Sequence, residues 1–212
     1  MLQYLLSVPS FLRFYWIFKL LKDFIPPKWE KVSFADTLKA SLGVMLDIPV
    51  YKFEDRNFKE NYYIYFPTLE ITNNPPVDKT ISDKKFVRLL QNKDWEEIRS
   101  YYLTIRQVLQ MWGTEIVRYT FGDRFWILRT LKGDDKFIIS DLRFITEFND
   151  VKNRNGLVYY IDRNMVPGSH PSEQEVLALL EMNKYDGVID NTGSLKDLFY
   201  NIKNNILCQL MK

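Results

Sequence analysis

Two neighbouring segments, LTIRQVLQMWGTEIVRYTFGDRFWI (residues 103–127) and FIISDLRFITEF (residues 137–148), decide which fold the sequence predicts. In the first, Thr104 stands where a helix N-cap is expected, and apolar residues then recur at helical spacing. The second opens with a continuous apolar run, which is typical of strands inside parallel sheets, and continues with Asp141 and Arg143. The two segments therefore predict a helix followed by a buried strand that has polar groups at its carboxyl end.

The rest of the chain alternates between strand and helix patterns. The expected strands are 32–34, 137–139, 157–161 and 188–189, and the expected helices begin near residues 36, 83, 94, 104, 172 and 194. Such alternation favours right-handed crossovers, so we expect an α/β fold with a mainly parallel sheet flanked by helices. Residues 50–82, which contain Asn73-Asn74 and several prolines, read as an irregular excursion.

The composition limits the classes of protein that the chain can belong to. Its 212 residues correspond to one domain, or to one domain with an insertion. A net charge of +2 gives no support for a nucleic-acid partner. Cys208 is the only cysteine and His170 the only histidine, which excludes an intrachain disulfide and a zinc site. A reducing compartment is the expectation, and we predict a cytoplasmic protein.

The amino terminus, residues 1–30, reads as a separate and unusual segment. Residues 2–25 carry apolar side chains at helical spacing and on the other sides too, which predicts a hydrophobic helix that Pro26-Pro27 would end. Charged residues such as Arg13 and Lys19 argue against a membrane span. A packed helix, an interfacial anchor and a segment foreign to the fold all remain open, with the packed helix preferred.

Polar residues on the helix from Thr104 suggest an anion site. Arg106, Gln110, Thr114 and Arg118 step by four residues and so form one slanting polar strip. Two arginines on such a strip can grip a phosphate with bidentate donors. The alternative interpretation is a solvated helix face, which the pattern alone favours slightly.

Two further residues have both a functional and a structural interpretation. Asp141 follows a buried strand, where an acidic residue often serves a magnesium ion, but it could equally cap the next helix or pair with Arg143. Trp126 offers an aromatic plate for a nucleobase, although most tryptophans in such a chain belong to the core.

Eight short segments, taken together and in order, resemble the phage-type deoxynucleoside monophosphate kinases. They are SFADTLK (33–39), RNFKE (56–60), LTIRQVLQMWGTEIVR (103–118), FWI (125–127), IISDLRFITE (138–147), YIDRN (160–164), HPSE (170–173) and DGVIDNTGSLKDL (186–198). The resemblance implies a three-layer P-loop-kinase-like fold over residues 31–212, with an irregular and helical insertion at about 50–103. It also implies transfer of a phosphoryl group from ATP, with Mg²⁺, to a deoxynucleoside monophosphate in a phage-infected or bacterial cell.

The same resemblance assigns roles to individual residues. Lys39, Arg106 and Arg118 would lie towards the acceptor phosphate, and Trp126 would lie against the base. Asp141 and Arg143 would face the reacting phosphates, with Asp141 on the metal side. Close to the adenine of ATP would lie a loop that contains Asn191, Thr192 and Gly193.

The sequence departs from that family at one decisive feature. Its relatives begin with a strand and a glycine-rich loop ending in Gly-Lys-Ser/Asp/Thr, which cradles phosphates with backbone N–H groups. Here the first glycine is Gly43 and no G-x-x-x-x-G-K occurs, so we expect the usual first strand and phosphate loop to be missing. An interrupted gene or misassigned start, an inactive nucleotide-binding or scaffold protein, and a partner chain that supplies the loop are the alternatives.

Overall fold

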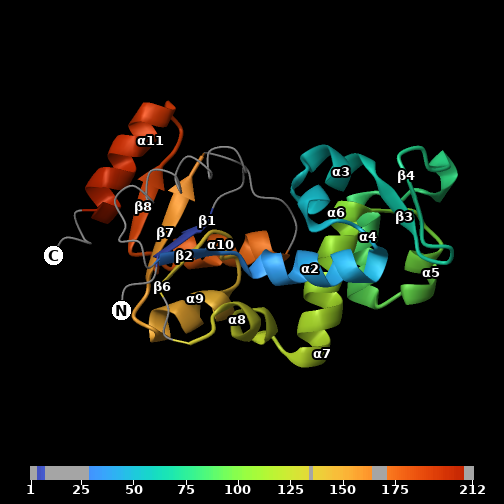
Figure 1. Cartoon of the computed structure of the whole chain (residues 1–212), viewed down its shortest axis with the longest axis horizontal. Coiled ribbons are helices and arrows are strands. Elements are labelled where there is room, and N and C mark those ends of the chain that lie inside the picture. The colour runs from blue at the N-terminus through green and yellow to red at the C-terminus, as the bar shows by residue number, and fades with distance from the viewer. Residues whose placement is uncertain (1–3, 8–28, 134–135, 164–170, 208–212) are drawn as a thin grey trace. The chain divides into compact units, whose positions relative to one another are not determined.

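The computed structural model describes residues 4–7, 29–133, 136–163 and 171–207 (Figure 1). The chain divides into two compact units, which are described separately. Unit 1 comprises Met1–Phe34 and Ile127–Lys212, and unit 2 comprises Ala35–Trp126. The inserted unit is therefore longer than the predicted insertion at 50–103.

Unit 1 is an α/β unit built on a five-stranded sheet. Its strands are β1 (Tyr4–Ser7), β2 (Trp29–Val32), β6 (Lys136–Ile139), β7 (Leu157–Asp162) and β8 (Gly187–Asp190). Its helices are α8 (Phe125–Thr130), which starts in unit 2, α9 (Ile145–Asn153), α10 (Pro171–Glu181), α11 (Leu195–Ile202) and the π-helical η4 (Lys203–Leu207). The predicted strands at 137–139, 157–161 and 188–189 are confirmed.

The sheet has the strand order β2-β6-β1-β7-β8, and every pairing in it is parallel. β2 and β6 lie on one side of β1, whereas β7 and β8 lie on the other. The direction of the connections thus reverses at β1, and in open α/β sheets the ligand crevice lies outside the carboxyl end of the strand at such a reversal. The mainly parallel α/β sheet is as predicted.

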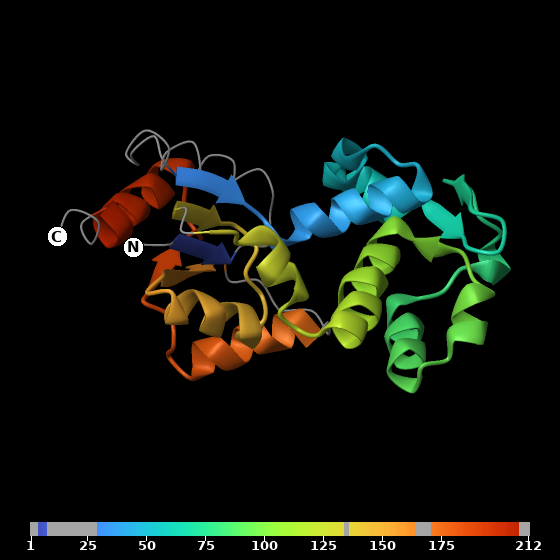
Figure 2. The same cartoon turned by 60° about the horizontal axis from the view of Figure 1, so that its bottom comes forward.

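Side chains of β7 alternate between the two faces of the sheet. Tyr159 and Ile161 pack with Leu198 and Ile202 of α11, whereas the ring of Tyr160 lies 5.6 Å from that of Tyr185, which also contacts α9 through Phe148. Helices therefore cover both faces, and Figure 2 shows α11 separated from α9 and α10. Two-residue alternation in a strand produces this division.

The amino-terminal prediction is wrong where the structure describes it. Tyr4–Ser7 form a strand, not part of a helix, and this strand occupies the centre of the sheet between β6 and β7. A first strand is therefore present, contrary to expectation. Periodicity cannot separate a short apolar strand from a buried helix. Pro9, which is unfavourable inside a helix, is the residue of this segment that argues against a continuous helix over 2–25. The remainder of the predicted helix, residues 8–25, lies outside the described residues.

Unit 2 is mostly helical and contains a small antiparallel sheet of order β4-β3-β5. Its strands are β3 (Tyr63–Tyr65), β4 (Glu70–Thr72) and β5 (Leu103–Thr104). Its helices are α2 (Phe34–Leu46), which starts in unit 1, α3 (Arg56–Asn61), α4 (Asp83–Asn92), α5 (Trp95–Arg99), α6 (Ile105–Gln110), α7 (Tyr119–Phe121), the 3₁₀ segments η1 (Val50–Glu54) and η2 (Val77–Lys79), and the π-helical η3 (Met111–Arg118).

Local sequence signals account for the start and the packing of the central helix of unit 2. The predicted N-cap at Thr104 is confirmed and forms part of a capping box, because the Thr104 hydroxyl accepts from the Gln107 N–H and the Gln107 side chain accepts from the Thr104 N–H. Gly113 allows η3 to approach α2, since a Cβ atom there would collide with Leu38. The core of this unit is apolar and includes Leu42, Phe53, Ile64 and Ile105, all fully buried.

Candidate functional site

Three cationic side chains of unit 2 come from three different helices and influence one another electrostatically. Lys39 projects from α2, Lys59 from α3 and Arg106 from α6. The positive charges of Arg106 and Lys39 both lower the pKa of Lys59, so the three groups lie within electrostatic reach of one another. The capping box at Thr104 fixes the start of α6, and the Asp55 carboxylate, which accepts from the Asn57 N–H, fixes the start of α3.

Two of these cations have carboxylate partners. The Lys39 ammonium lies 2.6 Å from Glu54, and Arg106 Nη2 lies 2.9 Å from Glu60 Oε1. Glu60 also accepts from Arg56 Nε at 3.1 Å, and this bond is the main reason that the pKa of Glu60 is lowered. Carboxylates therefore hold Lys39 and Arg106 in place.

Lys59 differs from both neighbours. Its side chain is half-buried, and within the described ranges it makes no ion pair or hydrogen bond. Burial is the largest cause of its lowered pKa, followed by Arg106 and Lys39, while Glu54 and Glu60 act in the opposite sense. A partly desolvated cation beside two others is stabilised by an added anion, so the cluster Lys39–Lys59–Arg106 is suited to a phosphate.

A hollow of about 270 Å³ lies on the neighbouring part of η1 and α3. It is lined by Tyr51, Lys52, Asp55, Asn57, Phe58 and Tyr62. Its single cation, Lys52, lies 5.6 Å above the Phe58 ring, and its single carboxylate, Asp55, caps α3. The hollow offers aromatic surface but no excess of positive charge.

The structure does not bring Arg118 to the same place. Arg118 is buried and donates through Nη1 to the Asp123 carbonyl oxygen at 3.1 Å. It stands twelve residues from Arg106, which corresponds to about three helical turns. Residues 111–118 are also π-helical, so residues four positions apart there no longer lie on one face of the helix. The predicted grip of both arginines on one phosphate therefore has no geometric support in this structure.

Trp126 is a core residue in this structure. Its side chain is only 3% exposed, and the indole N–H donates to the Gly113 carbonyl oxygen at 2.9 Å. The Phe125 ring meets it edge-on, with ring centroids 5.0 Å apart. A base could stack on this ring only if the core opened, so the packing interpretation replaces that of an exposed plate.

Asp141, predicted to face the reacting phosphates and the metal, lies in unit 1 at the carboxyl edge of the parallel sheet. Asp141 follows β6, and its two oxygens accept from the Ser33 hydroxyl at 2.7 Å and the Phe34 N–H at 2.9 Å. It thus caps α2, while Glu147 accepts from the N–H groups of Arg143 and Phe144 at the start of α9. Neither predicted structural alternative, a cap on the next helix or a pair with Arg143, is correct.

Arg143 lies beyond the same strand and is exposed. Its backbone N–H is bonded to Glu147, but its guanidinium group makes no ion pair in the part of the chain that the structure describes. An exposed cation at the carboxyl edge of a parallel sheet is compatible with a phosphate ligand.

The loop predicted to lie near adenine is locally well ordered by hydrogen bonds. The Asn191 N–H donates to the Asp162 carbonyl oxygen, and Thr192 donates to Asp190 through both its N–H and its hydroxyl. A Cβ atom at Gly193 would lie 2.8 Å from an Asp197 oxygen, so a larger residue there would displace the Asp197 side chain. Thr192 and Gly193 are exposed, whereas Asn191 is buried. The loop lies at the same edge of the sheet as Asp141.

The described residues do not fit an ATP–magnesium group well. At the sheet edge, both oxygens of Asp141 already have protein partners, and no three acidic, histidine or cysteine side chains gather within the described ranges. Residues 8–28, which follow β1 where the phosphate loop is expected, contain no glycine.

Sequence reasoning missed Lys59, Glu54 and Glu60. Lys59 and Glu60 belong to the RNFKE segment, which carries part of the family resemblance but no role for either residue. Nothing in the spacing of a six-residue helix marks one lysine as special. The resemblance is the one available signal, because this segment belongs to the same set of motifs as the segments that contain Lys39 and Arg106.

A parallel sheet with its first strand at the centre defines an α/β protein whose ligand crevice lies at the carboxyl ends of the strands. The family model for deoxynucleotide monophosphate kinase matches residues 55–202, well over half of the chain. The chain belongs to the deoxynucleotide monophosphate kinase family.

Two relatives are similar over shorter stretches. The deoxynucleotide monophosphate kinase of Enterobacteria phage T4 is 27% identical over 112 residues, which cover 49% of this chain and 45% of the phage protein. A protein of Acanthamoeba polyphaga mimivirus, provisionally given the same name, is 26% identical over 140 residues, which cover 58% of this chain and 71% of the viral protein. This chain thus spans less than half of the phage relative. Among the described residues, no helix is long and apolar enough to cross a membrane.

Proposed function

We propose that this chain binds the phosphate of a deoxynucleoside monophosphate with Lys39, Lys59 and Arg106, and that it acts in the phosphorylation of that nucleotide. The observation that carries the proposal is Lys59, a half-buried cation with no carboxylate partner among the described residues, beside two anchored cations. A phosphate monoester carries close to two negative charges at neutral pH and several acceptor oxygens, which complements such a cluster.

The family reaction is transfer of the γ-phosphoryl group of ATP to the monophosphate. In that reaction, catalysis comes from positioning and from neutralising charge on the phosphates. Arg143 is the residue of this chain that we propose to face the transferred group, because its guanidinium group is exposed at the carboxyl edge of the sheet. Asn191, Thr192 and Gly193 remain the proposed neighbours of the adenine.

The donor side of the reaction lacks its usual loop in this sequence, so the chain alone is proposed to bind the acceptor better than it turns it over. A second polypeptide that supplies a G-x-x-x-x-G-K loop would restore the donor side. The same absence supports a second candidate function, a nucleotide-binding protein without catalysis. Measured turnover separates the two candidates.

Isothermal titration calorimetry of the whole chain with each deoxynucleoside monophosphate tests the binding proposal. We expect dissociation constants in the high micromolar to millimolar range, about −4 to −6 kcal/mol. Lys59→Gln should weaken binding by about tenfold or more, because it removes a charged hydrogen-bond donor. The matched control is Lys84→Gln, which alters an exposed lysine on α4 of the same unit.

Two results would contradict the proposal. One is a folded protein that binds none of the four monophosphates. The other is an equal loss of affinity in Lys59→Gln and Lys84→Gln, which would indicate general electrostatic attraction and no built site.

A further inference from the structure

Glu60 is the carboxylate shared by two arginines beside the proposed phosphate site. Its Oε1 accepts from Arg106 Nη2 at 2.9 Å, and both of its oxygens accept from Arg56 Nε at 3.1 Å. Arg56 and Glu60 are one turn apart on α3, whereas Arg106 comes from α6. Glu60 therefore joins the helix that carries Lys59 to the helix that carries Arg106.

The contact with Glu60 uses only part of the Arg106 guanidinium group. That group carries five N–H donors in a fixed plane, and the bond to Glu60 involves the Nη2 nitrogen alone. Within the described residues, Arg106 makes no other side-chain hydrogen bond. The donors on Nε and Nη1 thus remain available for a phosphate, while the orientation of the plane is set by Glu60.

We infer that Glu60 is a positioning residue for the acceptor phosphate, holding Arg106 in the orientation in which its remaining donors face that phosphate. This inference rests on the proposed function, because it assigns a role within the Lys39–Lys59–Arg106 cluster. Glu60 also acts on Lys59, whose pKa its negative charge raises against the effects of burial and of Arg106. Without Glu60, Arg106 would lose its anchor and Lys59 would hold its proton less firmly.

The opposing interpretation is that Glu60 occupies Arg106 and must be displaced by the ligand. The two interpretations predict opposite signs for one substitution. Removing a competitor strengthens phosphate binding, whereas removing a positioning group weakens it. The position of Glu60 favours the positioning role, because Arg56 holds the carboxylate on its own helix and thereby keeps it in place when a phosphate arrives.

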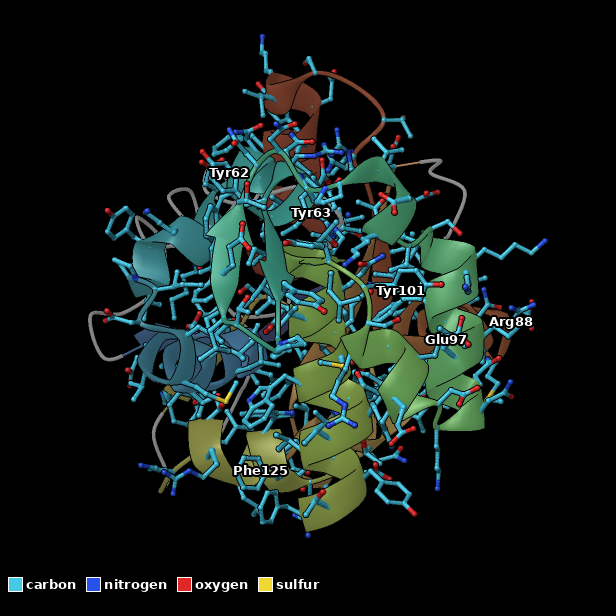
Figure 3. All side chains as sticks on the ribbon, turned by 90° about the vertical axis from the view of Figure 1, so that its right-hand side faces the viewer. Tyr62, Tyr63, Arg88, Glu97, Tyr101 and Phe125 are labelled. Carbon is cyan, nitrogen blue, oxygen red and sulfur yellow. The ribbon has the colours of Figure 1, made fainter. Side chains whose placement is uncertain are left out.

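The first experiment measures the affinity of the full chain for a deoxynucleoside monophosphate by calorimetry. Glu60→Gln should weaken binding by about fivefold to tenfold, and Glu60→Asp should recover part of that loss because it restores the charge. The matched control is Glu96→Gln, which removes an exposed carboxylate lying 3.8 Å from Arg99 on α5. Figure 3 shows Glu97, the next residue on α5, well apart from Tyr62, which follows α3. We expect the control to bind the nucleotide with unchanged affinity. We also expect Glu60→Gln to keep the thermal unfolding midpoint of the wild-type chain.

A double-mutant cycle shows whether Glu60 acts through Arg106. In an Arg106→Gln background, Glu60→Gln should have less than half of its effect on the logarithm of the dissociation constant. Equal or tighter binding by Glu60→Gln, or effects that simply add, would overturn the inference. Failure of the proposed function is a separate result, because then the wild-type chain would show no Lys59-dependent binding at all.

Discussion

Two regions of this protein place charged side chains where a nucleotide could bind, but they use those charges differently. At the carboxyl edge of the sheet in unit 1, the two carboxylate oxygens of Asp141 accept hydrogen bonds from the Ser33 hydroxyl and the Phe34 N–H. In unit 2, carboxylates hold Lys39 and Arg106, but Lys59 is left without an ionic partner among the described residues. A charged side chain is therefore evidence for ligand binding only where its hydrogen-bonding groups are not already used by other groups of the protein.

The largest expected effect concerns turnover. In a coupled assay with ATP, magnesium and each deoxynucleoside monophosphate, this chain alone should turn over far below the rate of about 1 per second that is typical of kinases. Loss of one preorganised donor costs ~10²–10³ in rate, and this sequence contains no G-x-x-x-x-G-K motif to supply such donors. A rate of about 1 per second or more would show that the donor side is complete and would remove the contrast between the two regions.

The second prediction tests whether Trp126 stabilises the fold or binds the base. Trp126→Ala should lower the free energy of unfolding by about 3–5 kcal/mol, because it empties a buried site and leaves the Gly113 carbonyl without its donor. Trp126→Phe should cost less, since most of the ring volume remains. Chemical denaturation of the two variants gives the measurement.

One outcome would instead support the interpretation of Trp126 as the ring on which the base stacks. If Trp126→Phe keeps wild-type stability but loses affinity for the monophosphate, the indole must reach the ligand in a state with a more open core. The tryptophan fluorescence of the wild-type chain, with and without nucleotide, supplies an independent check on that movement.

The sequence predicted those elements whose signals are local. The N-cap at Thr104 was predicted because one side chain and one backbone N–H three residues further along suffice to make it. The strands at 137–139 and 157–161 were predicted because continuous apolar runs suit parallel strands that are covered on both faces. The helix expected to begin near residue 194 is α11, and there the Ser194 hydroxyl accepts from the Asp197 N–H and donates to the Asp197 carboxylate.

What the sequence did not predict depends on contacts between distant residues. Lys59 is distinctive only because Lys39 and Arg106, twenty and forty-seven positions away, lie near it in the folded unit. Asp141 was placed correctly at a strand end, but the hydrogen-bond partners of its oxygens come from more than a hundred residues earlier. Leu195, the first residue of α11, is 43% exposed, whereas Leu198 and Ile202 of the same helix are buried.

The smallest expected effect concerns Asp141 as a helix cap. Asp141→Ala should lower the free energy of unfolding by about 1–2 kcal/mol, because the Phe34 N–H and the Ser33 hydroxyl lose their acceptors at the start of α2. Asp141→Asn should cost less, since an amide oxygen still accepts from the N–H and the amide nitrogen can donate to the hydroxyl. The matched control is Asp78→Ala, which alters a carboxylate in an exposed 3₁₀ segment. If Asp141→Ala is as stable as the control, the cap contributes nothing to folding. The carboxylate would then be available for the magnesium role, and the contrast between the two regions would become weaker.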